Sequence, residues 1–306
     1  MYFPYLRGKI YELALIEDCM EIIRRNHRIV PIVEPVRREC GNLAKKMIAY
    51  IEKGVPIVLI TNPTVGELCN QPHKILDDVV PMLNRKGDSH ILGFILTEST
   101  NSADIQRFMD QTRDNKVCFI HAYEYPNPRV FMGINNIAYH IFLSGMVDTL
   151  YQRHFTEPKN VIIEDGFKLK QKNALYPNDE NFSSINLTYK EGGFVGFGDY
   201  LIVGKEYKES GGPAHAVVIH LTYTKENGGI GIRHFVSDRT DSNQDTPGKF
   251  GEALAKLIAE RTNPRIIPTM AISNYQDLYD SDHFPGLGFV KKLSMEHHIE
   301  LMASLI

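Results

Sequence analysis

Residues 57–62 read IVLITN, residues 91–97 read ILGFILT and residues 117–121 read VCFIH. Each is a short run of apolar, often β-branched residues that ends on a polar one. Strands of a parallel α/β sheet are buried on both faces and read as continuous apolar runs, and their carboxyl ends carry whatever chemistry the fold has. The sequence therefore predicts such strands here and in further runs of the same kind, at 28–34, 140–144, 217–222 and 232–238.

Segments with helical periodicity alternate with these runs. Apolar residues recur with the helical period between 9 and 25, and further helices are predicted over 43–53, 73–85 and 103–113. Strand and helix follow each other at roughly 25–30 residues, which is typical of βαβ units and parallel strands. We therefore predict an α/β fold with a TIM-barrel-like core. With residues 2–7 and 200–203 included, nine strands are predicted where a barrel has eight, and periodicity does not identify the extra one.

The second half of the chain has weaker patterns. Helix signals are few after residue 156, so we expect one domain over 1–306 with an insertion at about 156–199. Asn227, Gly228 and Gly229 form a hairpin-type turn, which predicts an antiparallel pair between the flanking runs. A helix is predicted from Pro247 to Ala259, capped by Asp245 or Thr246, and a last helix over 293–305.

Composition restricts the class of protein. The 306 residues are 43% apolar, as in an ordinary globular protein, and their formal net charge of −3 gives no reason to expect a polyanionic partner. Four cysteines lie far apart without a C-x-x-C pair, so we predict neither a zinc ribbon nor a disulfide framework, and we expect a cytoplasmic location. No stretch has the pattern of a signal peptide or the apolar length of a membrane span.

The chain carries a family resemblance that would cover nearly its whole length. Residues 2–15 (YFPYLRGKIYELAL) and 28–35 (RIVPIVEP) resemble the start of the phage and bacterial Beta-protein family. The similarity to a bacterial branch with no assigned reaction extends through 196–204 (GFGDYLIVG), 209–223 (ESGGPAHAVVIHLTY), 234–238 (HFVSD) and 283–288 (HFPGLG). The resemblance implies a TIM-barrel-like fold and an accessory protein of mobile-element or phage-defence loci. It implies no catalytic residues.

Polar residues at the predicted strand ends are the first candidates for a site. In a barrel these ends converge on one rim, which would bring together Glu34, Asn62, Glu98, His121, Ser144 and Asp238, with Arg7 after the first strand. Carboxylates and a histidine on such a rim could act in acid–base catalysis or bind a divalent metal ion. The alternative is structural, with Glu34 and Asp238 forming ion pairs with arginines such as Arg37, Arg38 and Arg239.

Two loops add further candidates. Asp165, between Glu164 and Gly166, is an acidic residue that could join the catalytic set, although Asp-Gly is also a common turn. Ser210, Gly211 and Gly212 could form a backbone nest for an anion. They precede a strand and not a helix, so a P-loop is not predicted.

Other polar or glycine-rich positions favour structural roles. His220 lies within an apolar run and is expected to be a hydrogen-bonded core residue, and His297 and His298 lack the spacing of a zinc site. The glycine-dense segment 191–200 could be a platform for stacking bases, but a bent strand with close packing is favoured.

Two functions follow as hypotheses. In the first, the protein is an accessory or sensor subunit of a phage-defence or mobile-element system, with a ligand pocket at the rim and a protein partner encoded nearby. In the second, it is a metal-assisted hydrolase of a phosphate-containing small molecule or nucleotide, with Glu34, His121, Asp165 and Asp238 as metal ligands or acid–base groups. The sequence names no organic cofactor and leaves nucleic-acid binding open.

Overall fold

The computed structural model describes residues 1–86, 90–156, 159–209 and 215–306. Contacts gather in two compact units, the first formed by Met1–Glu164 and Thr188–Asp199 and the second by Asp165–Leu187 and Tyr200–Ile306. The expectation of a single folding domain over 1–306 stays a prediction. Within the described residues, no helix combines the length and the apolar character that crossing a membrane requires.

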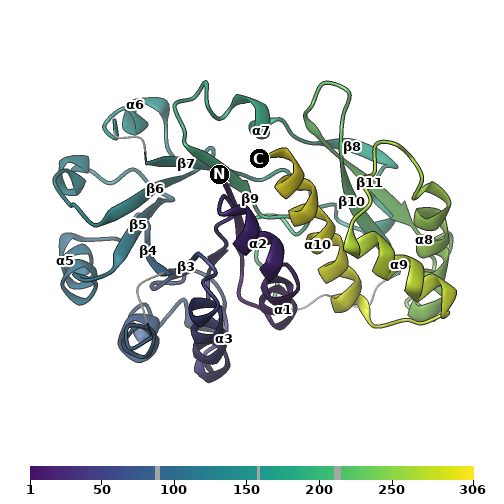
Figure 1. Ribbon diagram of the computed structural model, residues 1–306, viewed down its shortest axis with the longest axis horizontal. Helices are drawn as coiled ribbons and strands as arrows, with labels where there is room; N and C mark the ends of the chain where they lie inside the picture. Colours follow the sequence, from purple (N-terminus) through teal and green to yellow (C-terminus); the bar gives the residue numbers. More distant parts are fainter. Residues whose placement is uncertain (87–89, 157–158, 210–214) are drawn as a thin grey trace. The chain divides into compact units, whose positions relative to one another are not determined.

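The first unit is a closed barrel of eight parallel strands in the order β1-β2-β3-β4-β5-β6-β7-β9 (Figure 1). The TIM-barrel-like α/β prediction is therefore confirmed. The strands are β1 (Tyr2–Leu6), β2 (Ile32–Val33), β3 (Ile57–Ile60), β4 (His90–Leu96), β5 (Lys116–His121), β6 (Ile137–Leu143), β7 (Asn160–Glu164) and β9 (Gly196–Asp199).

Helices lie on the outside of the barrel strands, as the purple to teal part of Figure 1 shows for α3, α5 and α6. Their placement agrees with the apolar periodicity, and α5 begins with a capping box formed by Asn101 and Asp104. The segments are α1 (Ile10–Asp18), α2 (Met20–Asn26), α3 (Gly41–Glu52), η1 (Gly66–Leu68), η2 (Ile75–Val79), α4 (Val80–Leu83), α5 (Ser102–Gln111), η3 (Pro128–Phe131) and α6 (Thr149–Gln152).

Aromatic side chains contribute to the inside of the barrel. The rings of Phe3 on β1 and Tyr139 on β6 meet edge to face at 5.0 Å, although their strands are not neighbours in the barrel, so this contact crosses the interior. Successive side chains of a strand point to opposite faces. Tyr5 and Arg7 therefore continue the interior row of Phe3 toward the carboxyl end, whereas His140 faces the surrounding helices.

The stretch predicted to be an insertion supplies two barrel strands, β7 and β9. Strand β9 reads GFGD, so it lacks the apolar run by which the other barrel strands were predicted. It closes the barrel by pairing with both β7 and β1. A Cβ atom on Gly198 would lie 1.9 Å from the backbone oxygen of Phe3. Close packing therefore explains this glycine, as the interpretation of a bent strand expected.

The second unit contains an antiparallel sheet in the order β10-β11-β8. The predicted hairpin at Asn227–Gly229 joins β10 to β11, so these two apolar runs lie outside the barrel, and residues 200–203 form a turn instead of the predicted strand. The elements are η4 (Asn173–Leu175), β8 (Asp179–Ser183), β10 (Val218–Thr224), β11 (Ile230–Val236), α8 (Thr246–Glu260), α9 (Met270–Asp280) and α10 (Leu287–Leu305), and the short helix α7 (Ile185–Thr188) leads back to the first unit.

One apolar cluster joins the sheet and helices of the second unit. Ile219 on β10, Leu257 on α8 and Leu293 on α10 are fully buried within it. Helix α8 begins where the sequence predicted, because the side chain of Asp245 accepts a hydrogen bond from the backbone N–H of Gly248 at 3.0 Å.

Candidate functional site

An ion pair between Arg7 and Glu34 lies at the carboxyl ends of β1 and β2. The Glu34 side chain is fully buried and that of Arg7 is 12% exposed. Besides the guanidinium of Arg7, Glu34 accepts hydrogen bonds from the Tyr5 hydroxyl at 2.7 Å and from the backbone N–H and hydroxyl of Thr64 at 2.7 and 2.8 Å. All of these groups donate to Glu34, and together they tie the loop after β3 to the first strand.

The side chain of Asn62, at the end of β3, forms hydrogen bonds with the backbone of β4. Its amide nitrogen donates to the backbone oxygen of Ile95, and its amide oxygen accepts from the Ile95 N–H, both at 2.8 Å. These two bonds continue the β3–β4 ladder beyond the last paired residue. The side chain is thereby fixed at the rim, where part of its surface lines a cavity.

This cavity, of about 360 Å³, is formed by the loops that follow β3 and β4. We call it the rim cavity. Its volume is within the range of ~300–1,000 Å³ that is typical of small-molecule sites, and its place at the carboxyl ends of barrel strands is where such sites occur. The described lining residues are Asn62, Pro63, Thr64, Cys69, Pro72, His73, Phe94, Thr97, Ser99, Thr100 and Asp104.

Hydroxyl groups are the main polar feature of the rim cavity. The Thr97 hydroxyl lies 3.0 Å from that of Ser99 and 3.2 Å from that of Thr100, and Thr100 also accepts from the Thr97 backbone N–H at 2.9 Å. The Thr64 hydroxyl gives its proton to Glu34, so it presents lone pairs to a ligand. The set offers both donors and acceptors in fixed positions.

Sequence reasoning found Asn62 but missed the threonines. Thr97 ends one of the predicted strands, and Thr64 lies two residues after Asn62. Their positions at or just after a strand end were the only features of the sequence that could have indicated a place at the rim. Threonine also favours strands for steric reasons, and the residue type therefore does not indicate a site. Glu98 and Ser144, the other predicted rim residues, are exposed.

The structure places His121 on the helix-facing side of the barrel wall and not with the side chains at the mouth. Its Nδ1 lies 3.0 Å from the Tyr151 hydroxyl and its Nε2 lies 3.1 Å from Nδ1 of His140, and the ring stacks on Phe142. Burial, and secondarily the nearby His140, lowers the pKa of His121 well below its usual value, so the imidazole is neutral. His121 therefore does not join Glu34 at the barrel mouth, as was expected of residues at strand ends, because alternation along β5 turns this side chain outward.

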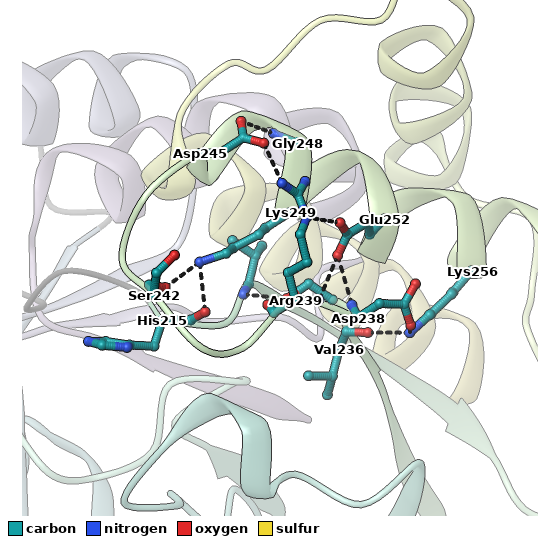
Figure 2. A network of polar contacts seen from close by, with 12 residues as sticks. His215, Val236, Asp238, Arg239, Ser242, Asp245, Gly248, Lys249, Glu252 and Lys256 are labelled. Atoms are coloured by element: carbon teal, nitrogen blue, oxygen red, sulfur yellow. Dashed lines mark hydrogen bonds and ion pairs between the residues drawn. The ribbon is translucent and has the colours of Figure 1, made fainter.

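Asp238 lies in the second unit, after β11 of the antiparallel sheet, and not at a barrel strand end. Figure 2 shows its carboxylate bound to the ammonium group of Lys256 at 2.6 Å and its backbone N–H donating to Glu252. Arg239 in turn pairs with Glu252 and Asp245. Glu34 and Asp238 therefore both form ion pairs, as the structural alternative expected, although their partners are Arg7 and Lys256.

The remaining candidates have simpler positions. Asp165 also belongs to the second unit, where its carboxylate accepts from the backbone N–H groups of Phe167 at 3.2 Å and Lys205 at 3.0 Å, as a turn residue would. Ser210, Gly211 and Gly212 lie outside the described residues. Over the ranges that the structure describes, no three His, Cys, Asp or Glu side chains gather closely enough to hold a metal ion.

Comparisons with known proteins give no relative from which a role could be transferred. No protein-family model, no curated protein and no solved structure matches this chain. A barrel alone does not specify a reaction, because unrelated functions share this fold.

Proposed function

We propose that the protein is a ligand-binding sensor or partner subunit that takes a small, neutral, hydroxyl-bearing molecule into the rim cavity. The observation that carries this proposal is the cavity itself, with several hydroxyl groups and the Asn62 amide around a space of about 360 Å³. Polar groups fixed by hydrogen bonds to the scaffold can orient such a ligand without further rearrangement.

The charges around the cavity favour a neutral ligand. No lysine or arginine is among its described lining residues, and Asp104 contributes one carboxylate. A phosphate group would therefore meet no cationic side chain there and would face a negative charge. This lining supports hydroxyl-rich molecules such as nucleosides or sugars over the phosphate-containing ligand expected from sequence.

The same site supports binding more than catalysis. Glu34 is already occupied by four donors, and a general base needs capacity to accept a proton. Cys69 and His73 share the cavity lining, yet among the described residues no hydrogen bond joins them, as a nucleophile and its base would require. Neither feature supports the hydrolase hypothesis.

The biological setting of the proposal rests on the resemblance to the Beta-protein family. In this setting, ligand binding would serve an accessory subunit of a phage-defence or mobile-element system and would be communicated to a protein encoded nearby. A barrel mouth built from loops suits this role, because loops can change with occupancy while the strands stay in place.

Binding can be tested by NMR titration with adenosine and D-glucose as probes. We expect saturable binding of at least one of them, weakened about three- to tenfold in Thr97→Val or Thr100→Val because each change removes one hydroxyl from the site. Thr149→Val is the matched control, since Thr149 is exposed at the start of α6 and does not line the cavity. Binding of a probe that these rim variants leave unchanged, or binding of neither probe, would count against the proposal.

A further inference from the structure

Exposed basic side chains lie at the amino ends of neighbouring barrel strands, at the end of the first unit opposite the rim cavity. The strands of the barrel are all parallel, so the residues that precede or begin them gather at one end. We call the exposed cations there the amino-end arc. It consists of Lys190 before β9, Arg28 before β2, Lys53 before β3, Arg85 before β4 and Lys116 at the start of β5.

Arg28 and Lys190 lie on either side of the start of β1. The backbone oxygen of Arg28 accepts a hydrogen bond from the Tyr2 N–H at 2.7 Å. Lys190 lies in the turn that leads into β9, the other neighbour of β1. Burial, then Arg28 and then Lys190, lowers the pKa of the Met1 amino group, so both cations lie within electrostatic range of the same group.

The turns before β3, β4 and β5 contact one another in the same order. Glu52 forms an ion pair with Lys86 at 3.0 Å, and the Asn115 amide nitrogen donates to the Asn84 amide oxygen at 2.8 Å. Each of these residues is adjacent in sequence to a cation of the arc, so the arc runs from β9 past β1 to β5. At about 4.8 Å between neighbouring strands, its length is about 24 Å.

The charges of the arc are available to a partner. Over the ranges that the structure describes, no side chain of the arc forms an ion pair with a carboxylate. Asp114 and Glu191 are exposed beside it, and the carboxylates at the neighbouring helix ends are occupied by cations outside the arc. A chain whose net charge is −3 therefore has a basic end. The occupied pairs are Arg24–Glu21, Lys86–Glu52 and Arg113–Asp110.

Two observations favour a nucleic-acid strand over other polyanions. Phe194 is half-buried in the glycine-rich turn that follows Lys190, where its ring can stack on a base beside the cations. In the described parts of the turns, at 24–31, 53–56, 84–86, 112–116 and 189–195, no large apolar side chain is exposed, so the arc lacks the anchors that hold proteins to a bilayer surface. A single strand can follow a curved row of cations, whereas duplex DNA is stiff over this length.

We propose that the amino-end arc is a binding surface for single-stranded nucleic acid. Its cations neutralise successive phosphates, a contact that depends on the backbone and not on the base sequence. About 24 Å corresponds to about seven nucleotides of a stacked strand at about 3.4 Å each. Phe194 receives a base at the β9 end of the arc. The surface shares no residue with the lining of the rim cavity.

Fluorescence anisotropy of labelled oligothymidylate and oligouridylate, each of about 20 nucleotides, tests this proposal on the full chain. Binding of either one supports it, and the tighter of the two identifies DNA or RNA as the partner. If about five phosphates are neutralised, the logarithm of the affinity should fall with the logarithm of the salt concentration with a slope of about −3.5, which is about a hundredfold loss between about 50 and 200 mM NaCl.

Charge-matched variants locate the surface. Lys53→Gln/Lys116→Gln/Lys190→Gln should bring the slope to about −1.5 and weaken binding at about 100 mM salt at least about tenfold, because three phosphate contacts are lost. The control removes the same charge from exposed lysines outside the arc and should bind within about twofold of the parent, because distant charges are screened. This control is Lys45→Gln/Lys168→Gln/Lys172→Gln.

Several outcomes would overturn the proposal. Absence of binding to both oligonucleotides at about 50 mM salt would remove the surface. An equal loss of affinity in the control variant would show that only the net charge of the chain matters. Binding to phosphatidylserine–phosphatidylcholine vesicles or to polyglutamate as tight as binding to the oligonucleotides would assign the arc to a membrane or an acidic protein. None of these outcomes bears on the rim cavity.

Discussion

Replacing Glu34 by glutamine should strongly destabilise the barrel, because Glu34 is the buried partner of Arg7. Glutamine can still accept from Thr64 with its amide oxygen, but its amide nitrogen would then face the Arg7 guanidinium and the Tyr5 hydroxyl. Removing one member of a buried ion pair costs about 3–5 kcal/mol. Since a whole protein is stable by about 5–15 kcal/mol, the loss is a large fraction of the total.

Urea unfolding measures this loss, with hydrogen exchange of the β1 and β2 amides to report the barrel specifically. We expect the midpoint of the Glu34→Gln variant to fall by at least about 1 M urea. Glu98→Gln is the matched control, because Glu98 follows β4 and is exposed. The double variant Arg7→Met/Glu34→Leu should be more stable than the sum of its single changes predicts, by about 1 kcal/mol or more. A Glu34→Gln variant within about 0.5 kcal/mol of the parent would refute the structural role assigned to this pair.

Three further changes test other parts of the account. Gly198→Ala should lower the free energy of unfolding, measured in urea, by about 3 kcal/mol or more, because the new methyl group clashes with the Phe3 backbone. Gly251→Ala in α8, where the space around the glycine is open, should leave the free energy of unfolding unchanged or raise it by up to about 1 kcal/mol. Burial lowers the pKa of His297 to about 4 from the ordinary 6.5, so the folded state keeps this imidazole neutral and about 3 kcal/mol of the free energy of unfolding should be lost as the pH falls from 6.5 to 4. His297→Gln should flatten that part of the pH–stability curve, and an unchanged slope would contradict this expectation. Asp238→Asn should change the free energy of unfolding by less than about 1 kcal/mol, because the side chains of Asp238 and Lys256 are 71% and 42% exposed; a larger loss would give this pair a role that its exposure does not explain.

The barrel could be predicted because most of its strands are buried on both faces and read as apolar runs. The prediction failed at β9, where Gly196 and Gly198 replace apolar side chains so that the backbone can approach β1. It also failed at β10 and β11, which are apolar because helices of the second unit cover them and not because they belong to the barrel.

The site was harder to predict than the fold. A polar residue at a strand end can point into the mouth, as Glu34 does, or toward the helices, as His121 does. Side chains alternate along a strand, so the direction can be assigned only when one interior residue of that strand is known. The cavity threonines belong to loops whose path depends on hydrogen bonds such as that from Thr64 to Glu34, across 30 residues of sequence. Long-range bonds of this kind leave no local pattern.

Alkylation of Cys69 tests the occupancy of the rim cavity most directly. Cys69 is exposed and lines this cavity, whereas Cys40 does not line it and Cys19 and Cys118 are buried. We predict that the deproteinised small-molecule fraction of a bacterial extract, or a bound nucleoside or sugar, slows iodoacetamide labelling of Cys69 while leaving that of Cys40 unchanged. Equal labelling rates of Cys69 with and without these molecules would contradict the claim that this barrel binds its ligand at the ends of β3 and β4.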